Sequence, residues 1–138
     1  MAIIPSLIKQ FFTKRINQIE HFRKYPVETQ KENLFRIITA AALTEWGRKY
    51  DYSSIRSVEE YQSRVPVRAY EEYLPYIERL RKGESNLTWP GDIKWFAKSS
   101  GTTSAKSKFI PISKESLQGC HYQAAKDILA IYTYNNPD

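Results

Sequence analysis

Residues 95–111 read WFAKSSGTTSAKSKFIP, and this stretch decides the fold that we predict. Apolar and polar residues alternate from Ile93 to Lys98, and Phe109 to Ile112 forms a second short apolar run. Both patterns are typical of β-strands. The segment between them is nearly devoid of apolar side chains. The sequence therefore predicts a hairpin in which two strands flank a polar loop.

The loop of this hairpin has the residue types that bind a polyphosphate. Gly101 allows the backbone to approach a ligand closely, and backbone amides can donate hydrogen bonds to phosphate oxygens. Lys106 and Lys108 supply positive charge, and hydroxyl groups come from Ser99, Ser100, Thr102, Thr103 and Ser104. The loop lacks the second glycine and the following helix of a Walker A motif. The residues alone leave two interpretations open, a phosphate site and a flexible polar loop.

Positive charge gathers around this loop. The chain of 138 residues has a formal net charge of +6, and residues 94–114 contain five lysines and no carboxylate. Such a segment repels itself unless water or an anion surrounds it. The charge is compatible with nucleic acid, an anionic membrane surface or a phosphorylated ligand, and a solvated basic hairpin is the alternative.

Helical patterns occupy most of the remaining N-terminal half. Apolar residues at spacings of three and four predict a helix over residues 4–25. Packing into a core is the commoner reason for this pattern, although a membrane-surface helix has a similar one. A second helix is expected over residues 28–46, with a capping box at Thr29 and Glu32 and a stop at Gly47.

Three more helices are predicted further along the chain. A capping-box spacing opens a short helix over residues 57–63. The next helix covers residues 69–81, with a kink or restart at Pro75 and an end at Gly83. The last helix covers residues 113–134, and its expected buried face consists of Leu117, Cys120, Ala124, Ile128 and Ile131.

The composition fits an ordinary globular protein, with 41% hydrophobic and 26% charged residues. The single cysteine, Cys120, excludes an internal disulfide, fits a reducing compartment, and is expected to be buried. The two histidines, His21 and His121, are too few and too isolated to predict a metal site. The apolar start, residues 2–12, is too short to span a membrane. We expect a cytoplasmic protein without a membrane partner.

Residues 95–104 and 108–111, WFAKSSGTTS and KFIP, resemble the first nucleotide-binding motif of the auxin-responsive promoter family. These proteins are acyl-acid amido synthetases, a branch of the acyl-adenylate-forming superfamily. Ala105 stands where the family commonly has glycine, a difference that concerns the flexibility of the loop. Other segments resemble the N-terminal region of the family in the same order, at residues 44–48, 64–67, 70–71, 75–77 and 136–138.

The resemblance implies an activity and a site. Family members activate a carboxylic acid with ATP, release pyrophosphate, and transfer the acyl group from the adenylate to an amine, usually that of an amino acid. ATP and Mg²⁺ are the implied cofactors, and no residue of this chain is implied as a catalytic group or as a metal ligand. His121 and Tyr122 are candidates for lining an acyl pocket, with plain packing as the alternative. The implied phosphate-binding residues are Ser99, Ser100, Gly101, Thr102, Thr103 and Lys108.

The predicted fold class is α/β and rich in helix, the N-terminal fragment of an acyl-adenylate-forming fold with a two-strand hairpin around the phosphate loop. Family members are several times longer, and two strands rarely form a stable sheet alone. The resemblance implies that residues 1–138 are the N-terminal portion of an ATP-dependent acyl-adenylating domain. Its parts are a helical layer, residues 1–83, and a strand–loop–strand–helix unit, residues 93–134. We expect this chain to be inactive by itself.

Two other classes of function stay open. A small nucleic-acid-binding module would stack bases on Trp95, Phe96 and Phe109. This interpretation is less favoured, because aromatic residues in strands are expected to be buried on at least one face. An assembly module without catalysis would form oligomers through its unpaired strand edges.

Overall fold

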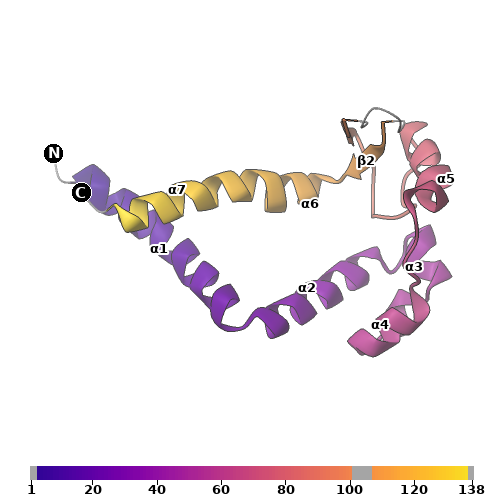
Figure 1. The fold of residues 1–138 in the computed structure, drawn as a ribbon, viewed down its shortest axis with the longest axis horizontal. Coiled ribbons are helices and arrows are strands. Elements are labelled where there is room, and N and C mark those ends of the chain that lie inside the picture. The colour runs from indigo at the N-terminus through magenta and orange to yellow at the C-terminus, as the bar shows by residue number, and fades with distance from the viewer. Residues whose placement is uncertain (1–2, 101–106, 137–138) are drawn as a thin grey trace. The chain divides into compact units, whose positions relative to one another are not determined.

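The computed structural model describes residues 3–100 and 107–136, with side chains from residue 12 onward (Figure 1). The chain forms two compact units. Unit 1 comprises residues 1–30 and 115–138, and unit 2 comprises residues 31–114. The helix-rich class with a two-strand antiparallel sheet is confirmed.

Unit 1 is built on a pair of helices. Helix α1 (Ile3–Lys24) and helix α7 (Gln123–Asn135) lie side by side. Ile16 of α1 and Ala130 of α7 are buried. The predicted helix over residues 4–25 is therefore confirmed as α1. Its apolar residues recur on one side, which gives the helix a face to bury.

The last helix departs from the prediction in its interior. It consists of α6 (Lys114–Ser116), a π-helical segment η2 (Leu117–Tyr122), and α7. Asp127 pairs with Arg15 of α1, and Ala130 is buried. Of the predicted buried face, Leu117 is half-buried, whereas Ala124 and Ile131 are exposed. Cys120 is exposed, and Ile128 is 68% exposed, which makes the expected burial of both residues wrong.

The predicted helix over residues 28–46 is two helices. Helix α2 (Pro26–Ala41) begins at Pro26. Proline is favoured at the first position of a helix, because the N–H that it lacks would have no partner there. The predicted capping box at Thr29 and Glu32 is therefore wrong, since both residues lie inside α2.

Thr44 separates α2 from α3 (Glu45–Lys49). Its hydroxyl donates to the Ala41 carbonyl at 2.7 Å and accepts from the Gly47 amide at 3.0 Å. Gly47 therefore lies inside α3 and is not a helix stop. A Cβ atom on Gly47 would lie 2.0 Å from the Ala41 carbonyl oxygen, so the close approach of the two segments requires glycine.

The predicted helices over residues 57–63 and 69–81 are confirmed as α4 (Val58–Arg64) and α5 (Tyr70–Arg81), without the restart expected at Pro75. After the short 3₁₀ helix η1 (Tyr52–Ser54), the Ser57 hydroxyl caps α4 by accepting from the Glu60 amide at 3.0 Å. Helix α5 ends at Arg81, and Gly83 follows two residues later with a φ of 89°, in the left-handed region that glycine tolerates.

The hairpin pairs β1 (Trp95–Lys98) with β2 (Phe109–Ile112) in antiparallel register, Lys98 opposite Phe109. The bounds of β2 are those predicted, whereas β1 begins two residues later than predicted. Ile93 is buried against the packed residues Leu80 and Leu87 instead of belonging to the strand. A second core cluster consists of Ile38, Ala41, Trp46, Tyr52 and Ile55.

No helix among residues 3–100 and 107–136 is long and apolar enough to cross a membrane. The cytoplasmic location stays a prediction.

Candidate functional site

The two ends of the predicted phosphate loop are joined by hydrogen bonds. The Ser99 amide donates to the Lys108 carbonyl at 2.9 Å. The Lys108 amide donates to the Ser99 hydroxyl oxygen, also at 2.9 Å. The Ser99 hydroxyl can donate one hydrogen bond and accept two. It accepts this bond from Lys108 and keeps its own proton for donation to another group. Strand pairing thus continues one residue beyond β1 and closes the loop at its base.

The structure places some of the predicted phosphate-binding residues. Ser99 is half-buried and Ser100 is exposed. Gly101, Thr102 and Thr103 lie outside the described residues. Phosphate binding by these residues and by Lys108 stays a prediction, and the described geometry brings Ser99 and Lys108 together.

Lys108 is in contact with the first turn of α5. Its Nζ atom lies 3.6 Å from Oε1 of Glu71 and 4.8 Å from the centroid of the Tyr70 ring. The side chains of Lys108 and Glu71 are 45% and 70% exposed. The Lys108 ammonium, at the end of the loop, is therefore accessible to solvent and forms an ion pair with the Glu71 carboxylate.

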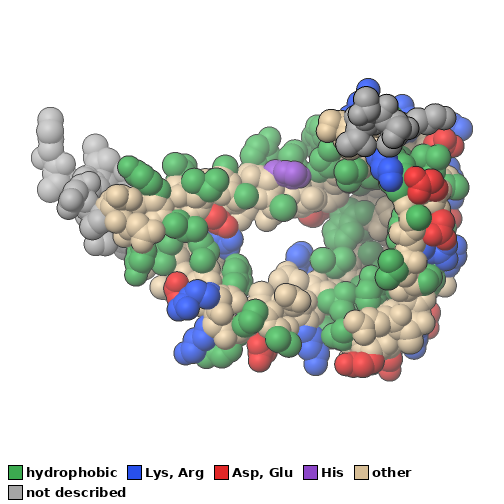
Figure 2. All heavy atoms as spheres, in the orientation of Figure 1, with side chains coloured by type: hydrophobic (Ala, Val, Ile, Leu, Met, Phe, Trp, Pro, Cys, Tyr) green, Lys and Arg blue, Asp and Glu red, His purple; other side chains and the backbone are tan. Residues whose placement is uncertain are grey.

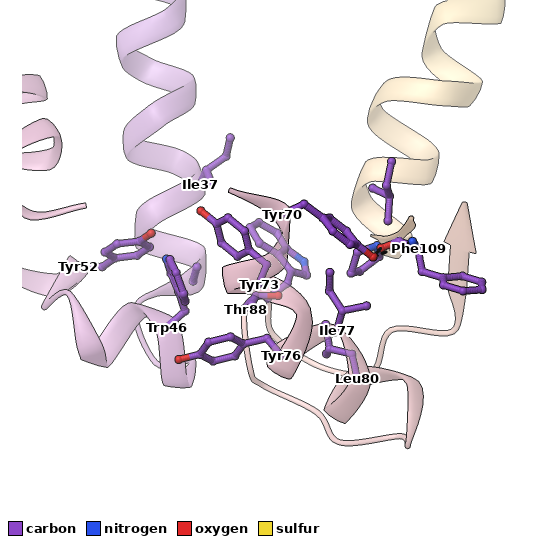
Figure 3. Close-up of a pocket in the computed structure, with 14 residues that line it drawn as sticks. Ile37, Trp46, Tyr52, Tyr70, Tyr73, Tyr76, Ile77, Leu80, Thr88 and Phe109 are labelled. Carbon is purple, nitrogen blue, oxygen red and sulfur yellow. Dashed lines mark hydrogen bonds between the residues drawn. The ribbon is translucent and has the colours of Figure 1, made fainter. Parts of the chain in front are cut away.

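Tyr70 also binds the backbone of β2. Its hydroxyl accepts from the Phe109 amide at 2.8 Å and donates to the Phe109 carbonyl at 3.2 Å (Figure 3). Adjacent residues of a strand direct their backbone groups to opposite sides. Since Lys108 pairs with Ser99 of the neighbouring strand, the polar groups of Phe109 face the outer edge. The Tyr70 hydroxyl therefore makes the two hydrogen bonds to Phe109 that a neighbouring third strand would otherwise make.

An apolar cavity of about 400 Å³ lies beside β2, within unit 2 (Figure 3). Burial, as the largest cause, raises the pKa of Tyr52 in its wall to about 12. A polyphosphate would find few polar partners there, so the cavity suits apolar groups. Its walls come from α2, α3, η1, α5, the segment before β1, and β2: Ile37, Ala41, Trp46, Tyr52, Tyr70, Tyr73, Tyr76, Ile77, Leu80, Thr88, Trp89, Phe109, Ile110 and Pro111.

His121 and Tyr122 belong to the π-helical segment of unit 1, and both are exposed. A π-helical turn inside an α-helix is frequent at functional sites. Lining of an acyl pocket by these two residues stays a prediction.

No group of three or more His, Cys, Asp or Glu side chains that could hold a metal ion is found in the described part of the chain.

The sequence analysis did not identify Tyr70 and Glu71 as site residues. Only the resemblance of residues 70–71 to a family segment drew attention to them. The contact between Tyr70 and Phe109 joins residues 39 positions apart. Periodicity within one helix gives no signal for such a contact.

Comparison with known proteins identifies relatives of the chain. The GH3 family N-terminal domain matches residues 15–137. The jasmonoyl-L-amino acid synthetase GH3.5 of Oryza sativa subsp. japonica is 31% identical over 104 residues, which are 75% of this chain and 18% of the relative. The indole-3-acetic acid-amido synthetase GH3.2 of Arabidopsis thaliana is 30% identical over 105 residues, 75% of this chain and 19% of the relative.

A solved structure agrees with these relatives. The GH3.15 acyl acid amido synthetase superposes with a TM-score of 0.56 and 31% identity, over 62% of this chain and 16% of that protein. The chain thus spans less than a fifth of the length of these proteins.

Proposed function

This chain belongs to the GH3 family, and we propose that it supplies the phosphate-binding loop of an ATP-dependent acyl acid amido synthetase. The reaction of the whole protein would activate a carboxylic acid with ATP and transfer the acyl group to the amine of an amino acid. In this proposal residues 1–83 form a helical layer of the adenylating domain, and residues 93–134 form the strand–loop–strand–helix unit.

One observation carries the proposal for this chain: the hydrogen bonds between Ser99 and Lys108 close a serine- and threonine-rich loop at its base. These bonds fix where the loop begins, at Ser99, and where it ends, at Lys108. Lys108 adds an accessible positive charge at the exit. Both features favour the binding of an anion.

The chemistry explains why such a loop is needed. A carboxylate has to approach the α-phosphate of a nucleotide, and both groups are anions. Mg-ATP, when bound, supplies pyrophosphate as the leaving group. Loop amides, hydroxyls and Lys108 would hold the phosphates and offset the negative charge that grows on the leaving group. Removing one preorganised donor of this kind typically costs on the order of 3 kcal/mol of barrier.

Mg²⁺ fits this chain as a partner of the nucleotide. Because the described residues contain no cluster of metal-binding side chains, the phosphates would supply its ligands from this side of the site. The amino acid and the rest of the nucleotide would be bound by parts of the protein outside residues 1–138. We therefore expect no amide synthesis from this chain alone.

Titration calorimetry of the chain with Mg-ATP tests the proposal. We expect weak binding, with a dissociation constant of about 1 mM. Lys108→Met should weaken it by about 5-fold, because a charge-assisted contact is lost. Lys94→Met, which removes an exposed lysine just before β1, is the matched control and should leave the affinity unchanged. Absence of binding at several millimolar Mg-ATP would contradict the proposal for this chain.

The activity of the whole protein needs a separate test. A longer protein that contains this chain should release pyrophosphate from ATP only when a carboxylic acid is present. Release without any acid would argue against an acyl acid ligase. The alternative function, a nucleic-acid-binding module, would instead be favoured by binding of single-stranded oligonucleotides that weakens steeply with salt.

A further inference from the structure

We propose that Tyr70 and Glu71, at the start of α5, are positioning residues for Lys108 in phosphate binding. Tyr70 fixes the strand that carries Lys108, and Glu71 holds the ammonium group until a phosphate replaces the carboxylate. This inference rests on the proposed function of the loop. It adds a second element, α5, to a site that the hairpin alone would otherwise form.

The contribution of Tyr70 is to make the loop exit rigid. The Lys108 backbone is held on one side by Ser99, and the next residue, Phe109, is held on the other side by the Tyr70 hydroxyl. The Phe109 ring is itself covered by the Arg81 guanidinium, 4.2 Å from the ring centroid. Lys108 and the first residue of β2, Phe109, are thus bound from two directions, so the lysine side chain leaves the backbone at a fixed point.

The contribution of Glu71 is to hold the charge in place. Its carboxylate lies 3.6 Å from the Lys108 ammonium, and the Tyr70 ring lies under the same group. An ion pair this exposed is weak in water, so a phosphate with greater charge can displace the carboxylate. Before displacement, the pair and the ring restrict the directions in which the long lysine side chain can point.

The two roles predict effects of opposite sign on phosphate affinity. Tyr70→Phe keeps the ring but removes both bonds to Phe109, so affinity should fall. Glu71→Gln removes a carboxylate that competes with phosphate for Lys108 and repels it. Because the exposed pair restricts the lysine only weakly, this gain outweighs the lost restriction and affinity should rise. A residue that only supports the fold would lower affinity when changed. An increase for Glu71→Gln therefore cannot come from a loss of general stability. For Tyr70→Phe, the helical content of the variant makes that distinction.

Calorimetry with Mg-ATP on the 138-residue chain measures both effects. We expect Tyr70→Phe to weaken binding by about 3- to 10-fold, the range for losing hydrogen bonds that order a site. We expect Glu71→Gln to strengthen binding by about 2- to 5-fold, the range for an exposed ion pair. Two matched controls lie on the same helix. Glu78→Gln removes an equal charge about two turns away, and Tyr76→Phe removes a hydroxyl from a residue that lines the cavity.

Hydrogen exchange of the Phe109 amide gives a readout that needs no ligand. Tyr70→Phe should make this amide exchange about 2- to 10-fold faster, because its hydrogen-bond acceptor is gone. Glu71→Gln and both control variants should leave the rate unchanged. The helical content of each variant, measured by circular dichroism, has to match that of the unmodified chain.

The outcomes distinguish this inference from the proposed function. If the unmodified chain does not bind Mg-ATP at several millimolar, both fail for this chain. If it binds Mg-ATP and the Tyr70→Phe and Glu71→Gln variants bind with unchanged affinity, the inference alone is overturned. A decrease for Glu71→Gln would equally overturn the displacement role, because it would assign Glu71 to the fold.

Discussion

The helices of unit 2 and those of unit 1 are held in different ways. In unit 2 a buried cluster with Trp46 and Ile38 at 7% and 2% exposure lies between helices whose ends are capped by side chains. In unit 1 the most specific described contact between α1 and α7 is a single ion pair, Arg15–Asp127. Apolar side chains lie open along the last helix (Figure 2), at exposures from 43% to 68%: Tyr122, Ile128, Leu129, Ile131, Tyr132 and Tyr134.

The two units therefore differ in what stabilises their helix packing, apolar burial in unit 2 and a polar contact in unit 1. Burial of aromatic and aliphatic groups stabilises unit 2 in proportion to the apolar area removed from water. Among the described side chains of unit 1 only Ile16 and Ala130 are buried. We therefore expect its polar contact to have a larger share in fixing how its two helices pair. An open apolar face of this extent is typical of a surface that contacts more protein. The predictions below test this contrast.

The largest expected effect is in the core of unit 2. The Trp46 ring lies 4.9, 5.3 and 5.2 Å from the rings of Tyr50, Tyr73 and Tyr76, in tilted and edge-on arrangements. Trp46→Ala should lower the free energy of unfolding by about 3–5 kcal/mol, because it leaves a large cavity. Ile128→Ala in unit 1 should change it by less than about 0.5 kcal/mol, since this side chain is 68% exposed.

Urea unfolding followed by circular dichroism measures both changes. Trp95→Ala is a useful control. This tryptophan is 45% exposed, so its replacement should lower the free energy of unfolding only slightly. Similar losses for Trp46→Ala and Ile128→Ala would contradict the contrast between the units.

The next effect concerns the ion pair of unit 1. The Arg15 guanidinium donates to both oxygens of Asp127, at 2.6 and 2.7 Å, and the two side chains are 23% and 24% exposed. A double-mutant cycle with Arg15→Met and Asp127→Asn should give a coupling energy of about 1–2 kcal/mol, since the bonds are charged, paired and partly shielded.

The exposed pair Glu20–Arg23 of α1 is the matched control, with side chains 56% and 76% exposed. Its coupling energy should stay below about 0.5 kcal/mol, the usual value for neighbours on a helix surface. Equal coupling in the two cycles would mean that the Arg15–Asp127 pair does not help to fix the two helices.

Local sequence signals predicted those parts of unit 2 that depend on neighbouring residues. Ser57 caps α4, Gly83 follows the end of α5, and β2 has its predicted bounds, because a hydroxyl, a left-handed torsion and an apolar run act over a few residues. The break at Thr44 was missed. The apolar pattern continues across it, and the helix ends where the threonine hydroxyl binds Ala41.

Contacts between distant segments could not be predicted from the pattern. Gly47 has to be glycine because a Cβ atom there would collide with the Ala41 carbonyl. The sequence pattern predicted a helix stop at Gly47 and gave no sign of this contact. Asp127 lies outside the predicted apolar stripe and pairs with Arg15 of α1, a partner that no pattern within the last helix indicates. In the candidate site, the loop residues came from the sequence, whereas the role of Tyr70 needed coordinates.

The smallest expected effect is the pH dependence of unit 1. Hydrogen bonds from Arg15, as the first cause, lower the pKa of Asp127 below its usual value. The unfolded pKa of aspartate is about 3.9. A carboxyl group whose pKa is lower in the folded chain stabilises the fold above the unfolded value. That contribution is lost as the pH falls through the folded value.

The measurement is the free energy of unfolding of the unmodified chain minus that of Asp127→Asn, from pH 7 to pH 2. Taking the difference removes the contributions of other carboxyl groups with lowered pKa values, such as Glu45 and Glu84. We expect a constant difference above about pH 5 and a decrease, on the order of 1 kcal/mol or less, in the acid range. A difference that stays constant down to pH 2 would show that Arg15 does not favour the charged form of Asp127. The pairing of α1 with α7 would then have to rest on the apolar contacts around Ile16 and Ala130, as the packing of unit 2 rests on Trp46.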